Sequence, residues 1–223
     1  MAMGEHLAIP MTDRQDPSHD LLTLTQWLSP AFPLGGFAYS HGLETAIADG
    51  RISDAAGLEA WLDGLLRYGS AWCDGILLAR ALAGDAAEDL QDLASALAPS
   101  RERWGESLAQ GRAFQAIVAP DAASPLVLPV ALGVAARDLN LAPQTVVGLY
   151  LQAWLSNLVL CSVRAIPLGQ AQGQSVITNL NARISELAPQ IAAAELDDLS
   201  SIALAGDLAS LQHETLSARL FKS

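Results

Sequence analysis

No charged side chain occurs between Asp138 and Arg164. A helix this long without charge must be covered over most of its surface, either by lipid or by other helices. Gln152 and Asn157 interrupt the apolar run, and Trp154 lies inside it rather than at a membrane interface. We therefore predict a central helix that other helices bury on all sides, with a membrane-spanning helix as the alternative.

The rest of the chain favours helices as well. Of its 223 residues 51% are hydrophobic and only 5% aromatic, and many of the apolar residues are Ala and Leu. These two residues form helices readily because they lose little side-chain freedom there. The sequence shows no convincing strand, repeat or break in composition. It predicts an all-α fold, a single irregular helical bundle of about eight to ten helices.

Apolar spacing and turn residues give the expected boundaries. We expect helices over 21–28 (capped by Asp20), 37–49 (ended by Gly50), 58–82 (capped by Ser53, bent near Gly69), 85–98, from Ser100 to Pro120, 125–137, 145–164 (with Pro143 in the first turn), 176–187 (ended by Pro189) and 207–211. Residues 1–20 are expected to form a flexible N-terminal leader, 21–212 the helical domain and 213–223 a C-terminal partner-docking tail.

The charge of the chain excludes several classes of function. The net charge is −12, and no basic cluster is present to neutralise phosphates or an anionic membrane. Lys222 is the only lysine, so the chain has neither a Walker loop nor an internal Schiff-base lysine. Cys73 and Cys161 form no metal-binding or redox pair, which favours free thiols in the cytoplasm and no bound cofactor.

The segment 29–44 reads SPAFPLGGFAYSHGLE and is the most unusual part of the chain. Its paired glycines allow positive φ or close backbone approach, as in a packed helix–loop–helix corner. An enzymatic alternative is a serine hydrolase with Ser40 as nucleophile, His213 as base, and Asp197 or Asp207 completing the triad. That nucleophile elbow requires a strand before the serine, which the sequence does not predict.

A metal site is a further alternative. His41 and Glu44 are three residues apart, on one face of the expected helix, and His213 is followed directly by Glu214. Two such pairs could meet and hold a borderline metal. With four histidines in the chain we expect no stable site, but transient metal contact at His41, Glu44 or His213 is left open.

Two other segments suggest recognition of a partner. RAIPLGQAQGQ, residues 164–174, places several glutamines, which are neutral donors and acceptors, at a helix start. The tail HETLSARLFKS, residues 213–223, ends with a Leu-Phe pair between two cations, in a chain that is otherwise strongly acidic. We expect this pair to be exposed and to dock on another protein.

Together the three segments resemble the UreF family of urease accessory proteins, over roughly residues 21–223. The matching positions are Pro33, Gly35, Gly36, Phe37, Tyr39, Ser40, Gly42, Leu43 and Glu44 in the first segment, Pro167, Gly169, Gln170 and Gln174 in the second, and His213, Glu214, Arg219, Leu220, Phe221, Lys222 and Ser223 in the tail. The resemblance implies that these residues bind partners.

The same resemblance implies an all-helical, non-catalytic chaperone of nickel insertion. Such a protein bridges a UreD-type accessory protein, also called UreH, and the GTPase UreG. It forms a homodimer and associates with apo-urease during urease maturation. The absence of a nucleotide-binding lysine loop fits this expectation, because the GTPase is then a separate chain.

Overall fold

The computed structural model describes residues 17–222. These residues form ten α-helices and two short 3₁₀ helices and contain no strand, so the predicted all-α bundle is confirmed. The elements are α1 (Pro17–Leu28), η1 (Gly36–Ala38), α2 (Leu43–Ala48), α3 (Ala55–Tyr68), α4 (Ser70–Ala83), α5 (Ala87–Leu97), α6 (Arg101–Val118), α7 (Leu128–Ala136), α8 (Pro143–Ala165), α9 (Gln170–Ala192), η2 (Leu196–Asp198) and α10 (Leu204–His213).

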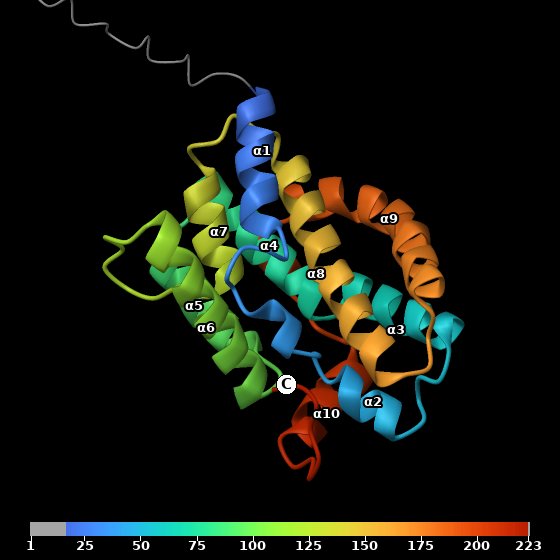
Figure 1. Ribbon diagram of the computed structural model, residues 1–223. Coiled ribbons are helices and arrows are strands. Elements are labelled where there is room, and N and C mark those ends of the chain that lie inside the picture. The colour runs from blue at the N-terminus through green and yellow to red at the C-terminus, as the bar shows by residue number, and fades with distance from the viewer. Residues whose placement is uncertain (1–16, 223) are drawn as a thin grey trace, which may run out of the picture.

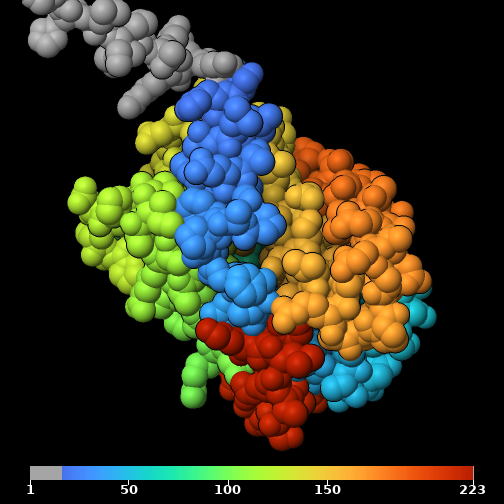
Figure 2. Space-filling view, in the orientation of Figure 1, coloured from blue at the N-terminus to red at the C-terminus, as the bar shows by residue number. Residues whose placement is uncertain are grey.

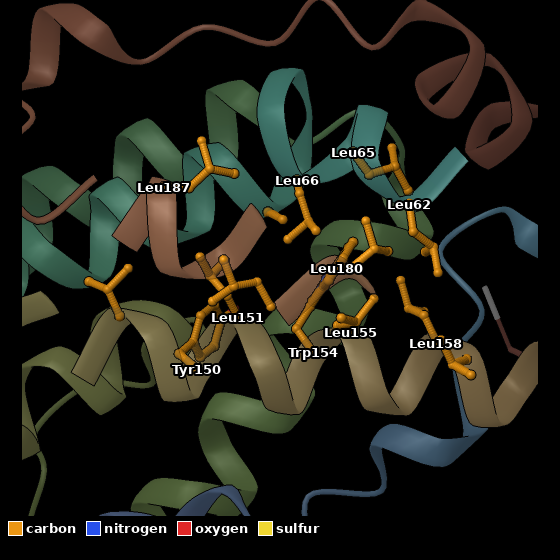
Figure 3. Close-up of a cluster of buried hydrophobic side chains, with 14 of the residues drawn as sticks. Leu62, Leu65, Leu66, Tyr150, Leu151, Trp154, Leu155, Leu158, Leu180 and Leu187 are labelled. Atoms are coloured by element: carbon orange, nitrogen blue, oxygen red, sulfur yellow. The ribbon is translucent and has the colours of Figure 1, made fainter. Parts of the chain in front are cut away.

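The uncharged stretch forms α8, which runs through the middle of the molecule (Figure 1). It packs most extensively along α9 and also contacts α1, α2, α3 and α4. In Figure 3 Leu151 and Leu155 of α8 lie in one cluster with Leu66 of α3 and Leu180 of α9. By length and composition α8 could cross a membrane, but half of its apolar window is buried inside the molecule. Its position is that of a core helix.

Several predicted helix ends are confirmed. Ser100 caps α6, because its Oγ accepts a hydrogen bond from the Arg103 amide at 3.2 Å. Pro143 stands in the first turn of α8, where its missing N–H costs nothing. Gly50 follows α2 with φ of 73°, as expected at the end of a helix.

Other predicted ends are wrong. The cap of α3 is Asp54 rather than Ser53, since its Oδ1 accepts from the Gly57 amide at 2.8 Å. The expected bend at Gly69 is a complete break between α3 and α4. Pro189 lies inside α9, which continues to Ala192, so the proline does not end the helix.

At the N-terminus, α1 begins at Pro17, earlier than predicted. Asp20 therefore lies within the helix instead of capping it, and its Oδ2 accepts a hydrogen bond from the Asn140 amide at 2.9 Å. This hydrogen bond connects α1 to the loop between α7 and α8. The rest of the predicted leader, residues 1–16, lies outside the described residues.

Two glycines with positive φ flank α2, but their surroundings differ. At Gly42 (φ 76°) an added Cβ would lie 2.7 Å from the backbone nitrogen of Ser210 in α10. At Gly50 (φ 73°) an added Cβ would have no neighbour within 4 Å. Gly42 is therefore required both for its conformation and for the close approach of α10.

Substitution of these two glycines separates the cost of a positive φ from the cost of a clash with α10. Gly50→Ala should lower the free energy of unfolding by about 1–2 kcal/mol, the cost of a left-handed conformation for a residue with a Cβ. Gly42→Ala should lower it distinctly further, because α10 must also move. Urea denaturation followed by circular dichroism measures both variants. Equal losses would contradict the role assigned to the close approach.

Candidate functional site

The second half of α8 holds the glycine-rich loop by its backbone. Asn157 Nδ2 donates to the carbonyl of Gly36 at 2.9 Å, and one turn later Cys161 Sγ donates to the carbonyl of Tyr39 at 3.3 Å. Burial raises the pKa of the Cys161 thiol to about 12, so the sulfur keeps its proton for this contact. The two loop carbonyls thus gain partners from side chains on one helical face.

The loop itself is not the helix predicted over 37–49. η1 is a single 3₁₀ turn, Tyr39 is extended, and His41 and Gly42 both have positive φ, at 53° and 76°. Because consecutive positive φ values cannot belong to a right-handed helix, α2 starts only at Leu43. His41 and Glu44 are therefore not on one helical face, and that premise of the metal alternative is wrong.

His41 is buried and fully hydrogen-bonded. Its Nδ1 accepts from Trp154 Nε1 at 3.2 Å, and its Nε2 lies 2.8 Å from Glu106 Oε1 and 2.9 Å from Arg103 Nη1. Burial and the nearby Arg103 guanidinium lower the pKa of His41 more than Glu106 raises it. The ring is thus neutral at physiological pH.

Two carboxylates share Arg103, but their pKa values are shifted in opposite directions. Burial would raise the pKa of Glu106, but direct contacts with Arg103 and the histidine outweigh it and lower the pKa to about 2. Gln110 also donates to Glu106, at 2.9 Å. Asp74 lies 3.8 Å from Arg103 and accepts from the Tyr150 hydroxyl at 3.3 Å. These contacts are weaker, so burial raises the pKa of Asp74 to about 6.

A cavity of about 450 Å³ adjoins this network. Figure 2 shows the surface hollowed between α8 and the loop that follows α1. Apolar lining residues include Pro30, Phe32, Leu34, Leu160 and Val163, and polar ones Gln152, Ser156, Asn157, Gln170 and Gln174. The prediction that α8 is buried on all sides is therefore wrong. The polar residues that interrupt its sequence border the cavity.

His213 lies at the end of α10 and is completely buried. Its Nε2 is 3.1 Å from Glu44 Oε2, and its Nδ1 is 2.7 Å from Glu102 Oε2. Glu44 is thus turned towards α10, on the opposite side of the positive-φ turn from His41. Glu214, the next residue, accepts from the Arg101 amide at 2.8 Å instead of joining the cluster.

The tail folds back on the chain rather than extending from it. Glu44 accepts hydrogen bonds from the amides of Leu220 at 2.5 Å and Phe221 at 3.0 Å. The Phe221 ring is 5% exposed, with Arg164 5.0 Å from its centroid. Leu220 is 68% exposed. The expected exposed Leu-Phe pair is therefore wrong for Phe221 and correct for Leu220.

Lys222 completes the connection between the tail and the loop. Its amide donates to the carbonyl of Ala38 at 2.7 Å, and its Nζ lies 5.9 Å from the Tyr39 ring centroid. Ser223 lies outside the described residues. The first and third segments singled out in the sequence are thus in direct contact.

The second segment reaches the same region from α9. Its Gln170 and Gln174 are exposed and line the cavity together with Gly36 and Phe37 of the loop. The Gly169 amide donates to Gln172 at 3.0 Å, which fixes the start of the helix.

The predicted partner-binding positions divide by exposure. Exposed are Pro33, Phe37, Pro167, Gly169, Gln170, Gln174, Arg219, Leu220 and Lys222; partly buried are Gly35, Gly36, Tyr39 and Glu214; buried are Ser40, Gly42, Leu43, Glu44, His213 and Phe221. The buried residues make contacts within the chain and are not accessible at its surface.

The geometry of the hydrolase alternative is not found. Ser40 is buried, its Oγ accepts from the Glu44 amide at 3.4 Å, and no strand precedes it within residues 17–222. Both ring nitrogens of His213 contact carboxylates rather than this hydroxyl.

A metal site is likewise not formed. In the part of the chain that the structure describes, no group of three or more His, Cys, Asp or Glu could hold a metal ion. Transient nickel contact at His41, Glu44 or His213 stays a prediction.

The sequence analysis missed the residues of α6. Glu102, Arg103 and Glu106 supply a partner to each of the two buried histidines, and Asn157 and Cys161 anchor the loop. The spacing of Arg103 and Glu106 along one helical face is a signal of pairing. It does not reveal that the pair is buried.

Comparison with known proteins identifies relatives of this chain. Residues 52–181 match the family model described as UreF. The chain is 51% identical over 209 residues to a urease accessory protein UreF of Cereibacter sphaeroides, covering 92% of this chain and 100% of that protein. Those of Dinoroseobacter shibae and Rhizobium leguminosarum are 48% and 42% identical, each over 91% of this chain and over 98% and 96% of their own lengths.

The buried Glu106 gives a prediction about stability. At pH 7 Glu106→Gln should lower the free energy of unfolding by about 3–5 kcal/mol, because Arg103 loses its charged partner. Since the folded pKa of Glu106 lies below the usual 4.5, its contribution is present above that pH. It is lost as the pH falls towards about 2.

The stability gap between wild type and Glu106→Gln should therefore narrow between pH 4.5 and pH 2, as urea titrations at several pH values would measure. Glu88→Gln, an exposed carboxylate on α5, is the matched control and should change stability by less than about 0.5 kcal/mol. A gap that does not vary with pH would show that the charge of Glu106 is not what stabilises the fold.

Proposed function

Because the chain belongs to the UreF family of urease accessory proteins, we propose that it is a non-catalytic chaperone of nickel insertion. It bridges a UreD/UreH-type accessory protein and the GTPase UreG and assists assembly of the nickel centre in apo-urease. It works as a homodimer in the cytoplasm. The free, buried thiols of Cys73 and Cys161 support a reducing compartment.

The observation that carries this proposal is the meeting of three distant segments at one end of α8. The loop contributes Phe37, which is 60% exposed, and the tail contributes Leu220, at 68%. α8 contributes Leu160, at 44%, which lines the cavity together with Phe37. Exposed apolar side chains on a surface held by many internal hydrogen bonds are typical of a protein-binding site.

Cations border this surface although the chain as a whole is acidic. Arg164 contacts the carbonyl of Phe37, Arg219 contacts Glu102, and Lys222 lies over Tyr39. All three cations are exposed, in a chain of net charge −12. An apolar centre with a positive rim favours a partner whose surface is apolar and acidic. We assign this surface to the UreD/UreH-type protein, as proposed for the tail.

Substitution of Leu220 tests the assignment. Leu220→Asp places a charge in the proposed contact and leaves the backbone bonds of the tail to Glu44 in place. We expect at least roughly tenfold weaker binding to a UreD/UreH-type partner, in line with the loss of one well-packed interface residue. Co-expression, affinity purification and calorimetric titration measure the effect.

Ile117→Asp is the control, because Ile117 is 52% exposed at the end of α6 and outside this surface. Unchanged affinity of Leu220→Asp would remove the tail from the interface. Deletion of 219–223 should weaken the complex at least as much, with the helical circular dichroism spectrum retained.

The wider proposal is tested by reconstitution. Apo-urease, nickel, GTP and the UreD/UreH-type and UreG proteins should yield active urease only when this chain is added. Light scattering should find two copies of this chain in the complex with both partners. Full activation without the chain would refute the chaperone role, and a complex with one copy would refute the homodimer.

A further inference from the structure

The contact between the tail and the rest of the chain depends on one buried histidine. His213 is 0% exposed, with Glu44 of α2 at Nε2 and Glu102 of α6 at Nδ1. An ionised carboxylate only accepts hydrogen bonds, so both ring nitrogens must donate to satisfy both contacts. His213 thus bridges carboxylates from two different helices, one at each ring nitrogen.

Each of these carboxylates also binds the tail. Glu44 accepts from the amides of Leu220 and Phe221, and Glu102 accepts from Arg219 Nη1 at 2.5 Å. His213 thus contacts both carboxylates that bind the tail. Glu214, the residue after His213, accepts a hydrogen bond from the backbone amide of Arg101.

Glu44 needs a cation to serve as the receptor of the tail. It is 8% exposed, and a carboxylate this deeply buried is costly unless it is paired. No arginine or lysine contact to Glu44 is found among the described residues, and the basic side chain that contacts it is His213, 3.1 Å away. Because Glu44 captures backbone amides, this capture does not depend on which side chains stand at 220 and 221.

α10, in contrast, has contacts that do not involve His213. Ser210 Oγ is 2.7 Å from Ser100 Oγ, and the α10 backbone packs against Gly42. The tail beyond it is held by Glu44, Glu102, the buried Phe221 ring and the amide of Lys222. The tail can therefore detach while the helix stays in place.

We propose that His213 is the positioning residue of the C-terminal tail, and that its double contact with Glu44 and Glu102 is a latch between a seated and a released state. In the seated state Leu220, Arg219 and Lys222 complete the surface around Phe37. Loss of either contact releases residues 219–222 and removes that surface. The latch is a property of the isolated chain, and only its effect on partner binding rests on the proposed function.

Hydrogen exchange followed by NMR on the full chain tests the latch. In His213→Gln the amides of Leu220 and Phe221 should exchange roughly ten- to a hundredfold faster, as expected for losing hydrogen bonds to a charged group. Amides in α8 should keep their protection. His19→Gln, an exposed histidine of α1, is the matched control and should change neither.

Unchanged exchange at Leu220 and Phe221 would overturn the proposal. A similar increase in exchange rate throughout α8 would indicate that His213 only supports the fold. In that case the Glu102→Gln variant provides the test. The Glu102 side chain is 20% exposed, so this variant should fold, and it removes one half of the latch. Faster exchange confined to the tail in Glu102→Gln supports the latch, and wild-type exchange there refutes it.

Partner binding separates this proposal from the function on which it rests. His213→Gln should weaken binding to the UreD/UreH-type protein as Leu220→Asp does, although no exposed residue has changed. If the wild-type chain binds no such partner, the proposed function fails, while the exchange data still decide on the latch.

Discussion

Burial of α8 is the constraint on which the rest of the structure depends. A helix without charge between Asp138 and Arg164 favours burial, and α9, α4 and α1 cover most of it. Where α8 is covered, its polar side chains need hydrogen-bond partners within the molecule. Asn157 and Cys161 find theirs in the carbonyls of the glycine-rich loop.

The positive-φ turn at His41 and Gly42 lies between two buried histidine clusters, one around His41 and one around His213. His41 is neutral and is held with Glu106 and Trp154, next to the cavity. Beyond the turn, Glu44 faces His213, whose two nitrogens both contact carboxylates. Residues 41–44 thus connect the cavity, which His41 lines, to Glu44, which binds the tail. Both clusters use acidic residues of α6, which makes this helix a shared support.

The functional assignment depends on these internal contacts as much as on exposed residues. Six of the distinctive positions in the loop and the tail, among them Gly42, Glu44 and Phe221, are buried and cannot meet a partner directly. They order the backbone of the loop and the tail, in which Phe37 and Leu220 are exposed. Family membership gives the general role of an accessory protein.

By itself the sequence determined the all-helical class, the central position of α8 and some helix ends, such as those at Ser100, Pro143 and Gly50, because apolar spacing, caps and prolines act through local physics. It also identified the three unusual segments. Only the tertiary structure decided that they meet, that Pro189 stays within α9, and that Phe221 is buried. Contacts such as Glu44 with Leu220 join residues 176 positions apart, and their geometry follows from how α2, α6 and α10 pack, which no local pattern encodes.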